Sequence, residues 1–377
     1  MNALRKRNRL FTLAIGLTLT SSLPLVAQER PYMDGFPPLA PSPSAKTKIP
    51  LTRKEDGLLY RSEESHQEAG ASLEKYFNNT YLPMVRKHYP DQDLSLIKLA
   101  TRTSTADLEV HEDIAYARWG DRVMQLDLYF PSALEEPLPV VIFVHGGGWE
   151  RGSHRGYRPA AMAFAKRGFA TATVEYRLAG EAMFPAAIYD VKAAIRWLRA
   201  NAKTYHLDPE RFGITGGSAG GNIAVLTAVT FGDRRFDGPA NHLDQSSEIQ
   251  CVVSMYGPMG WTSWTWSNAK LGSPLREETL PDFHIANGAH LPPILFLNEW
   301  DHREYRNWGP DTMDLLRKLG KGDRAELTLI NAPHAFINFS PHQSIALDHL
   351  ERFFAKHLEK GFESKSPKDT PEAAREK

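Results

Sequence analysis

The stretch RFGITGGSAGGNIAVLTAVTF, residues 211–231, decides how this 377-residue chain folds. Its start, RFGIT, is a short apolar run typical of a buried strand, and its second half has the composition of an apolar helix. The pattern G-x-S-x-G, centred on Ser218, lies between the two. A serine at a sharp strand-to-helix turn needs small neighbours, because the backbone doubles back there. The stretch therefore predicts a nucleophilic Ser218 at a helix N-terminus, which favours a negatively charged intermediate.

A second glycine-rich segment, HGGGW at residues 145–149, follows the buried-strand run PVVIFV. Consecutive glycines leave backbone N–H groups open to a substrate oxygen, so the segment is a candidate oxyanion hole. We expect Gly147 and Gly148 to donate two hydrogen bonds there, and Ala219, directly after the serine, to donate the third. A phosphate-binding loop is disfavoured, because the run contains neither G-K-[ST] nor G-x-G-x-x-G. His145 is interpreted as bracing the loop rather than as a general base.

Two polar groups follow later strand-like runs, in the chain order Ser, Asp, His that this elbow requires. Asp301 follows the run PILFLNEW, and His334 follows AELTLINAP. The functional groups of an open α/β sheet gather at the carboxyl ends of its strands. A histidine there can take the serine proton while a carboxylate holds its other ring nitrogen. We therefore predict Ser218, Asp301 and His334 as catalytic residues. The nearby acids that could replace Asp301 are Glu299, Glu304 and Asp311.

The rest of the pattern predicts an α/β fold. Residues 108–119 and 121–130 alternate in the manner of strands and form an antiparallel N-terminal hairpin that turns at Gly120-Asp121. From residue 139 onward, short apolar runs alternate with helical segments. Repeated strand–helix units imply a mostly parallel central sheet with helices on both faces. One catalytic domain over residues 105–360 is expected, followed by a charged, disordered tail over 361–377.

The N-terminal region predicts export. A basic cluster at residues 5–9 precedes the apolar stretch LFTLAIGLTL, and Ala27 is a small residue at a cleavage point. This arrangement is typical of a secretory signal peptide over residues 1–27 and is too short for a membrane span. Residues 28–104 are interpreted as a proline-rich linker and an N-terminal extension. The expected location is the periplasm or the extracellular medium, with no membrane association after cleavage.

Composition excludes several classes of partner and site. Lys+Arg and Asp+Glu both total 45, and no basic stripe with interleaved aromatics is present, so nucleic acid is not an expected ligand. The single cysteine, Cys251, cannot form an intrachain disulfide or a cysteine-based metal site. We expect it to be a small buried hydrophobic residue. The sequence gives no indication of oligomeric state.

The motifs HGGGW, VEYRL, FPAAIYD and GGSAGG, together with Asp301 and His334, make the chain similar to the HGGG-type esterases. More specifically, residues 108–358 resemble the hormone-sensitive-lipase-like group and its neighbours, the bacterial feruloyl and acetylxylan esterases. The resemblance implies an α/β-hydrolase fold and serine esterase chemistry that needs no metal or organic cofactor. The chain departs from many relatives at residues 297–301, where LNEWD stands in place of His-Gly-x-x-Asp, so the aspartate is kept and the glycine is not.

The sequence thus predicts an exported serine ester hydrolase acting on a small-molecule or carbohydrate ester, such as an acetyl or feruloyl ester. Trp149, Trp261 and Trp264 are candidate substrate-binding residues, because aromatic rings form platforms for a sugar or an aromatic acyl group. The tryptophans over residues 261–266 could equally pack a lid or the core. The alternatives are an amidase, arylformamidase or exopeptidase on the same fold, a sugar-binding module without catalysis, and a lipid-processing enzyme at a membrane surface.

Overall fold

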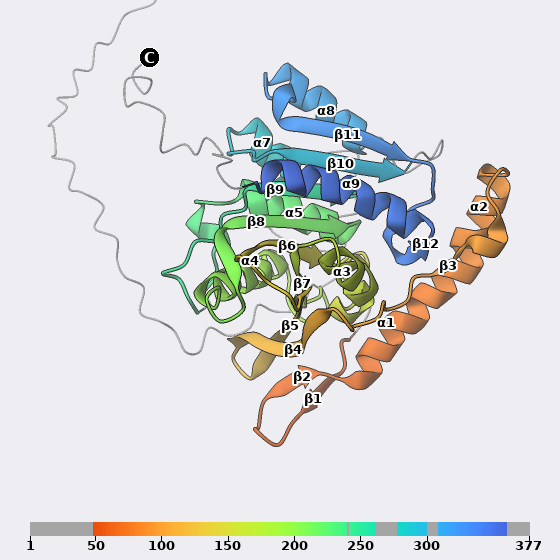
Figure 1. The fold of residues 1–377 in the computed structure, drawn as a ribbon. Coiled ribbons are helices and arrows are strands. Elements are labelled where there is room, and N and C mark those ends of the chain that lie inside the picture. The colour runs from red at the N-terminus through yellow and green to blue at the C-terminus, as the bar shows by residue number, and fades with distance from the viewer. Residues whose placement is uncertain (1–47, 240, 261–276, 300–307, 360–377) are drawn as a thin grey trace, which may run out of the picture. The chain divides into compact units, whose positions relative to one another are not determined.

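A computed structural model describes residues 48–239, 241–260, 277–299 and 308–359. Its centre is a sheet with the strand order β1-β2-β5-β7-β6-β8-β9-β10-β11, and β4 pairs with β5 beside this path (Figure 1). The strands from β6 to β11 run parallel, whereas β5 is antiparallel to both β4 and β7. The predicted α/β-hydrolase architecture, with a mostly parallel sheet and an antiparallel entry, is confirmed.

The strands have the following bounds: β1 Leu51–Arg53, β2 Leu59–Arg61, β3 Lys98–Leu99, β4 Leu108–Trp119, β5 Arg122–Pro131, β6 Leu138–Val144, β7 Ala170–Val174, β8 Leu207–Gly217, β9 Cys251–Met255, β10 Ile294–Glu299, β11 Ala325–Ile330 and β12 Phe339–Ser340. The predicted hairpin is β4 and β5, and it turns at Gly120 and Asp121 as expected. Gly120 has a φ of 59°, a backbone conformation that glycine adopts without steric cost.

The helices have the following bounds: α1 Glu63–Tyr76, α2 Leu82–His88, α3 Arg158–Ala165, α4 Ala186–Ala200, α5 Ala219–Val229, α7 Pro281–Ala286, α8 Trp308–Lys318 and α9 His342–His357. A π-helical turn, η1, joins α1 to α2 over Phe77–Tyr81, and a 3₁₀ turn, η3, covers His154–Tyr157. Helices therefore follow the parallel strands in the alternation that the sequence predicts.

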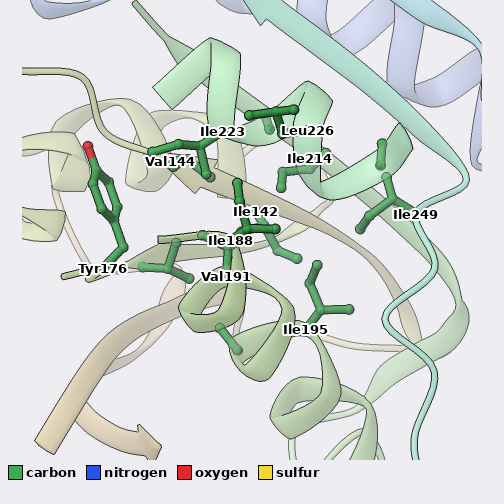
Figure 2. Close-up of a cluster of buried hydrophobic side chains, with 14 of the residues drawn as sticks. Ile142, Val144, Tyr176, Ile188, Val191, Ile195, Ile214, Ile223, Leu226 and Ile249 are labelled. Carbon is green, nitrogen blue, oxygen red and sulfur yellow. The ribbon is translucent and has the colours of Figure 1, made fainter. Parts of the chain in front are cut away.

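Both faces of the sheet are buried, and strand β6 shows why. Its side chains alternate, so Val140, Ile142 and Val144 pack into the core formed with α4 and α5 (Figure 2). Val141 and Phe143 point to the opposite face, into a second core formed with α3 and α9. A strand buried on both faces must be apolar at every position, which explains the continuous run at residues 140–144. Cys251 in β9 lies in the second core and is buried, as expected.

The segment before the hairpin, residues 48–100, packs against the central sheet and against β12. Strand β2 pairs with β5 at Leu59, and β3 pairs antiparallel with β12. Tyr81, Val85, Tyr89 and Ile97 form a separate small core with Phe339. The described part of the N-terminal extension, from residue 48, therefore packs against the sheet and beside β12, just before α9. Within the described residues, no helix combines the length and apolar character needed to cross a membrane.

His342 joins this extension to α9. Its Nδ1 lies 2.6 Å from the Tyr81 hydroxyl, and its Nε2 lies 2.9 Å from Oε1 of Gln92. Because the Gln92 oxygen can only accept, Nε2 carries the proton and Nδ1 accepts from Tyr81. Burial lowers the pKa of His342 from 6.5 to about 4. The folded state therefore holds this imidazole neutral.

This arrangement predicts a loss of stability on acidification. The unfolded chain takes up a proton on His342 below about pH 6.5, and the folded chain does so only near pH 4, so the free energy of unfolding falls as the pH falls. Between pH 7 and pH 5 the contribution of one such histidine is about 2 kcal/mol. Urea denaturation measures the free energy of unfolding at pH 7 and at pH 5. Its decrease between the two pH values should be about 2 kcal/mol smaller for His342→Gln than for the parent chain. An equal fall in both proteins would contradict the assignment.

Candidate active site

Ser218 lies at the reversal between β8 and α5. Strand β8 ends at Gly217 and helix α5 begins at Ala219, so a single residue makes the turn. Ser218 has φ 56° and ψ −121°, a conformation that is strained for a residue with a side chain. Its N–H donates to the carbonyl oxygen of Met255 at 2.9 Å, which ties the turn to strand β9. The predicted nucleophile elbow is therefore present, and Ser218 is partly exposed on it.

Close backbone packing explains the glycines around the elbow. A Cβ at position 220 would lie 2.1 Å from the carbonyl oxygen of Val144, and one at position 216 would lie 2.4 Å from the carbonyl oxygen of Gly220. Neither neighbour is a flexible side chain that could move aside. Strand β6, strand β8 and helix α5 thus meet at van der Waals distance, and only glycine fits between them.

The HGGGW loop lies directly beside Ser218. A Cβ at Gly146 would be 3.3 Å from Cβ of Ser218 and 2.7 Å from the carbonyl oxygen of Gly217. Gly147 is exposed and has a φ of 123°, and Gly148 follows with a φ of 61°. The structure therefore brings two of the predicted oxyanion-hole residues, Gly147 and Gly148, to the loop that contacts the elbow. The third, Ala219, is the first residue of α5.

His145 lies beneath this loop. Its ring stacks on Tyr176 with centroids 4.3 Å apart, and the Tyr176 hydroxyl donates to the His145 carbonyl oxygen at 2.9 Å. Nδ1 lies 2.8 Å from the carbonyl oxygen of Gly146. Burial lowers the pKa of His145 to about 3, so the ring is neutral at physiological pH. These contacts suit a residue that braces the loop.

Two buried tyrosines lie beside the elbow, and one of them contacts His334. A Cβ at Gly217 would lie 2.4 Å from the Tyr256 hydroxyl oxygen and 2.5 Å from that of Tyr157. The Tyr256 ring in turn contacts His334, with centroids 4.6 Å apart. Tyr256 therefore touches both the residue before Ser218 and His334, which places the predicted base at the elbow. Neither tyrosine lies in a sequence motif that would mark it as part of the site.

Glu299 holds the imidazole of His334. Its Oε1 lies 3.0 Å from Nδ1 of His334. Glu299 is the last residue of β10, and only 2% of its side chain is exposed, against 26% for His334. An ionised carboxylate can only accept a hydrogen bond, so Nδ1 of His334 carries the proton. Nε2 is therefore the ring nitrogen that can exchange a proton with Ser218. This is the geometry that orients a catalytic histidine.

The predicted acid, Asp301, lies outside the described residues, as does the alternative Glu304. Among the described residues it is Glu299 that contacts Nδ1 of His334. The sequence did carry this signal, because Glu299 is one of the alternatives at the end of the strand run. The departure from His-Gly-x-x-Asp at this strand also pointed to a change in local geometry.

Trp149 occupies a different environment from the one expected for a sugar platform. Only 2% of its surface is exposed, and it belongs to the core between the sheet and helices α4 and α5. It lines a small, mostly apolar pocket together with Phe184, Asn222 and Leu226. Its backbone is tied to the next segment by the Ala179 N–H, which donates to the Trp149 carbonyl oxygen at 2.8 Å. Trp261 and Trp264 lie outside the described residues.

A cluster of titratable side chains near η3 is an ion-pair network. Asp113, Asp127 and His154 bring their polar atoms within 4.8 Å of one another, a spacing that could suit a metal ion. However, Arg158 pairs with Asp127 at 2.8 Å and with Asp113 at 3.0 Å, and Arg155 pairs with Asp113 at 2.9 Å. The two guanidinium groups supply positive charge to the carboxylates. The hydrogen bond from His154, together with Arg155 and Arg158, lowers the pKa of Asp113. Burial would raise the pKa of Asp127, but His154 and Arg158 lower it.

Comparison with curated proteins points to esterases. Over 153 residues the chain is 34% identical to the "Probable carboxylic ester hydrolase LipM" of Mycobacterium tuberculosis. The match covers 40% of this chain and 35% of the relative. Over 102 residues the chain is 43% identical to "Carboxylesterase NlhH" of the same organism, covering 27% of this chain and 32% of the relative. The matched part spans about a third of the length of these relatives.

Solved structures share the fold. A "Bifunctional GH43-CE" protein of Bacteroides eggerthii superposes with a TM-score of 0.57 at 26% identity, covering 66% of this chain and 38% of that one. Esterase 2 of Thermogutta terrifontis gives a TM-score of 0.58 at 24% identity, covering 72% of this chain and 98% of that one. At this identity the second likeness concerns the fold alone. The family model BD-FAE matches residues 126–283, which include the HGGGW loop and the elbow. The chain therefore has the α/β-hydrolase fold, and its residues 126–283 are similar to the BD-FAE family.

Proposed function

We propose that this chain is a serine carboxylic-ester hydrolase. The observation that carries the proposal is one arrangement of three parts. Ser218 sits at a strained elbow, the glycine loop of residues 146–148 lies against it, and the buried Glu299 orients His334 beside it. A nucleophile, an oriented base and a set of backbone donors are the parts that acyl transfer needs.

The reaction follows from the roles of these groups. His334 takes the Ser218 proton as the serine oxygen attacks the ester carbonyl carbon, and backbone N–H groups of Gly147, Gly148 and Ala219 hold the resulting oxyanion. Collapse of the tetrahedral intermediate breaks the bond to the alcohol oxygen, which leaves with the proton from His334. A water molecule then attacks the acyl-enzyme by the same steps and releases the carboxylic acid. Glu299 stays ionised and stabilises the imidazolium in both halves.

The substrate class is proposed from the relatives. Several of the curated relatives are named as carboxylic ester hydrolases, carboxylesterases or esterases. Structures of T. terrifontis esterase 2 are titled with bound butyrate and propionate, and two further structures are titled as carbohydrate esterases or with a CE module. We therefore propose short acyl esters, including acyl or feruloyl groups on carbohydrates, as substrates.

Export is also proposed. Its support is the order of a basic cluster, an apolar stretch and a small residue at Ala27. Acylated carbohydrates outside the cell are a substrate that such a protein would meet.

The nucleophile is tested by Ser218→Ala. Loss of the attacking oxygen should reduce turnover of p-nitrophenyl acetate by at least roughly 10⁴-fold. Ser95→Ala, at an exposed serine whose hydroxyl donates to Asp93, is the matched control and should keep parent activity. Residual activity near the parent level in Ser218→Ala would refute the proposal.

A substrate panel tests the proposed substrate class. It contains acetyl, butyryl and palmitoyl esters, acetylated xylan, methyl ferulate, formyl-kynurenine and dipeptides. Faster cleavage of the amides than of the esters would favour an amidase.

The acid is tested by a matched pair of amide substitutions. Glu299→Gln removes the charge that stabilises the imidazolium and should lower kcat roughly 10²- to 10⁴-fold, with a smaller effect on KM. Asp301→Asn makes the same chemical change two positions along the chain, and we expect it to lower kcat less than tenfold. Steady-state kinetics on p-nitrophenyl acetate measure both. The reverse order of effects would assign the role to Asp301.

Export is tested by expressing the full chain with a C-terminal tag in a bacterial host. Intact-mass measurement of the purified protein should find Gln28 as the first residue, with the protein outside the cytoplasm. Replacing Arg5, Lys6 and Arg7 by glutamate should block both results. An unprocessed parent chain in the cytoplasm would refute export.

A further inference from the structure

Helix α1 runs past both loops that build the candidate active site. It belongs to the N-terminal segment of residues 48–100, which lies outside the BD-FAE match at residues 126–283. In Figure 1, α1 lies along the carboxyl ends of the strands, the edge at which β8 and β10 deliver Ser218 and Glu299. Both ends of this helix make specific polar contacts with the two loops.

The N-terminal end of α1 contacts the segment that carries the oxyanion-hole glycines. Nδ1 of His66 lies 2.7 Å from Oγ of Ser153, and both side chains are buried. Ser153 directly follows Gly152, where a Cβ would lie 2.2 Å from the carbonyl oxygen of Gly146 and 2.5 Å from Nδ1 of His145. The Ser153 oxygen also accepts the Arg155 N–H at 3.2 Å, so this side chain joins His66 to the turn that follows the loop. The contact between His66 and Ser153 is thus linked to Gly146 and His145, at the start of the glycine loop, through the tightly packed Gly152.

The C-terminal end of α1 contacts the catalytic histidine itself. The Tyr76 hydroxyl donates to the backbone carbonyl oxygen of His334 at 3.1 Å. The next residue, Ala335, has a φ of 70°, a left-handed conformation that is unfavourable for an alanine. A donor on the His334 carbonyl fixes the peptide that leads into this turn. Tyr76 also stacks on Phe339, with ring centroids 6.3 Å apart.

Further contacts from the same segment hold the two ends of the histidine loop. Nε2 of Gln92 donates to the Asn331 carbonyl oxygen at 2.6 Å, three residues before His334. The Ala100 N–H donates to the Asn338 carbonyl oxygen at 2.9 Å, four residues after it. The residues that carry His334 are therefore fastened before, at and after the histidine by residues 76–100.

We propose that α1 is a positioning element of the active site. Tyr76 fixes the orientation of His334, and His66 fixes the position of the glycine loop of residues 146–148. The two contacts are ten residues apart on one helix, a distance of about 15 Å along its axis. A rigid helix between them fixes the separation of the base and the oxyanion donors. This inference rests on the proposed ester hydrolysis and names residues outside the family match as part of that machinery.

The test is Tyr76→Phe, which removes the donated hydrogen bond and keeps the aromatic ring. The matched control is Tyr60→Phe, which removes a hydroxyl that donates to Asp56 on an exposed surface of the same segment. With p-nitrophenyl acetate, Tyr76→Phe should lower kcat about three- to tenfold, with KM within twofold of the parent and the thermal midpoint close to that of the control. His66→Ala should lower kcat by a similar factor. Unchanged kcat in Tyr76→Phe, or a raised KM at unchanged kcat, would overturn the inference.

A double-mutant cycle separates positioning from general loss of stability. If Tyr76 acts through the orientation of His334, Tyr76→Phe should have less than a twofold effect on kcat in the Glu299→Gln background, where that orientation is already lost. The same three- to tenfold loss in both backgrounds would mean that Tyr76 does not act through His334, and would overturn the assignment. These outcomes are read only against an active parent chain. Absence of esterase activity in the parent would instead refute the proposed function.

Discussion

The structure depends on one constraint, the reversal of strand β8 into helix α5 within the single residue Ser218. The positive φ of this serine is sterically costly, and it persists because the surrounding backbone leaves no alternative. The N–H of Ser218 is tied to Met255 of β9, and Gly220 fits against the Val144 carbonyl oxygen of β6. The elbow is therefore clamped between its two neighbouring strands. Because the residue is held at the turn, its side chain projects at the edge of the sheet.

The pairing of parallel strands then delivers the other groups. Val144 pairs with Gly216, so the loop that leaves β6 begins beside the two residues that precede Ser218. Glu299 pairs with Ile330 at the carboxyl end of the sheet, and His334 follows Ile330 by four residues. Register alone thus places a buried carboxylate at the end of one strand and a histidine shortly after the end of the next. The short Ile330–His334 connection accounts for the contact between Glu299 and His334.

These relations explain what the sequence could predict. The elbow, the HGGGW loop, the hairpin and the strand-end position of His334 are local patterns, because each is encoded within one continuous stretch of the chain. The acid is harder to predict, since a sequence that alternates as a strand assigns positions 299 and 301 to the same side, and both positions carry a carboxylate. Tyr76 could not be found in this way. Its contact with His334 spans 258 residues, and no local pattern marks a tyrosine whose partner is a backbone carbonyl.

The N-terminal segment is bound to the sheet by charge as well as by packing, which is why it cannot be treated as a detachable linker. Arg61 of β2 is buried and lies in the field of Glu175 and Glu181. Burial alone would raise the pKa of Glu175, but Arg122 at 2.9 Å, together with His154 and Arg61, lowers it to about 2. A buried ionised carboxylate is stable only while its cations remain, so removing the segment would leave Glu175 less compensated. The helix that begins directly after Arg61 and Ser62 is α1. The electrostatic anchor and the contacts with the two active-site loops therefore belong to one continuous element.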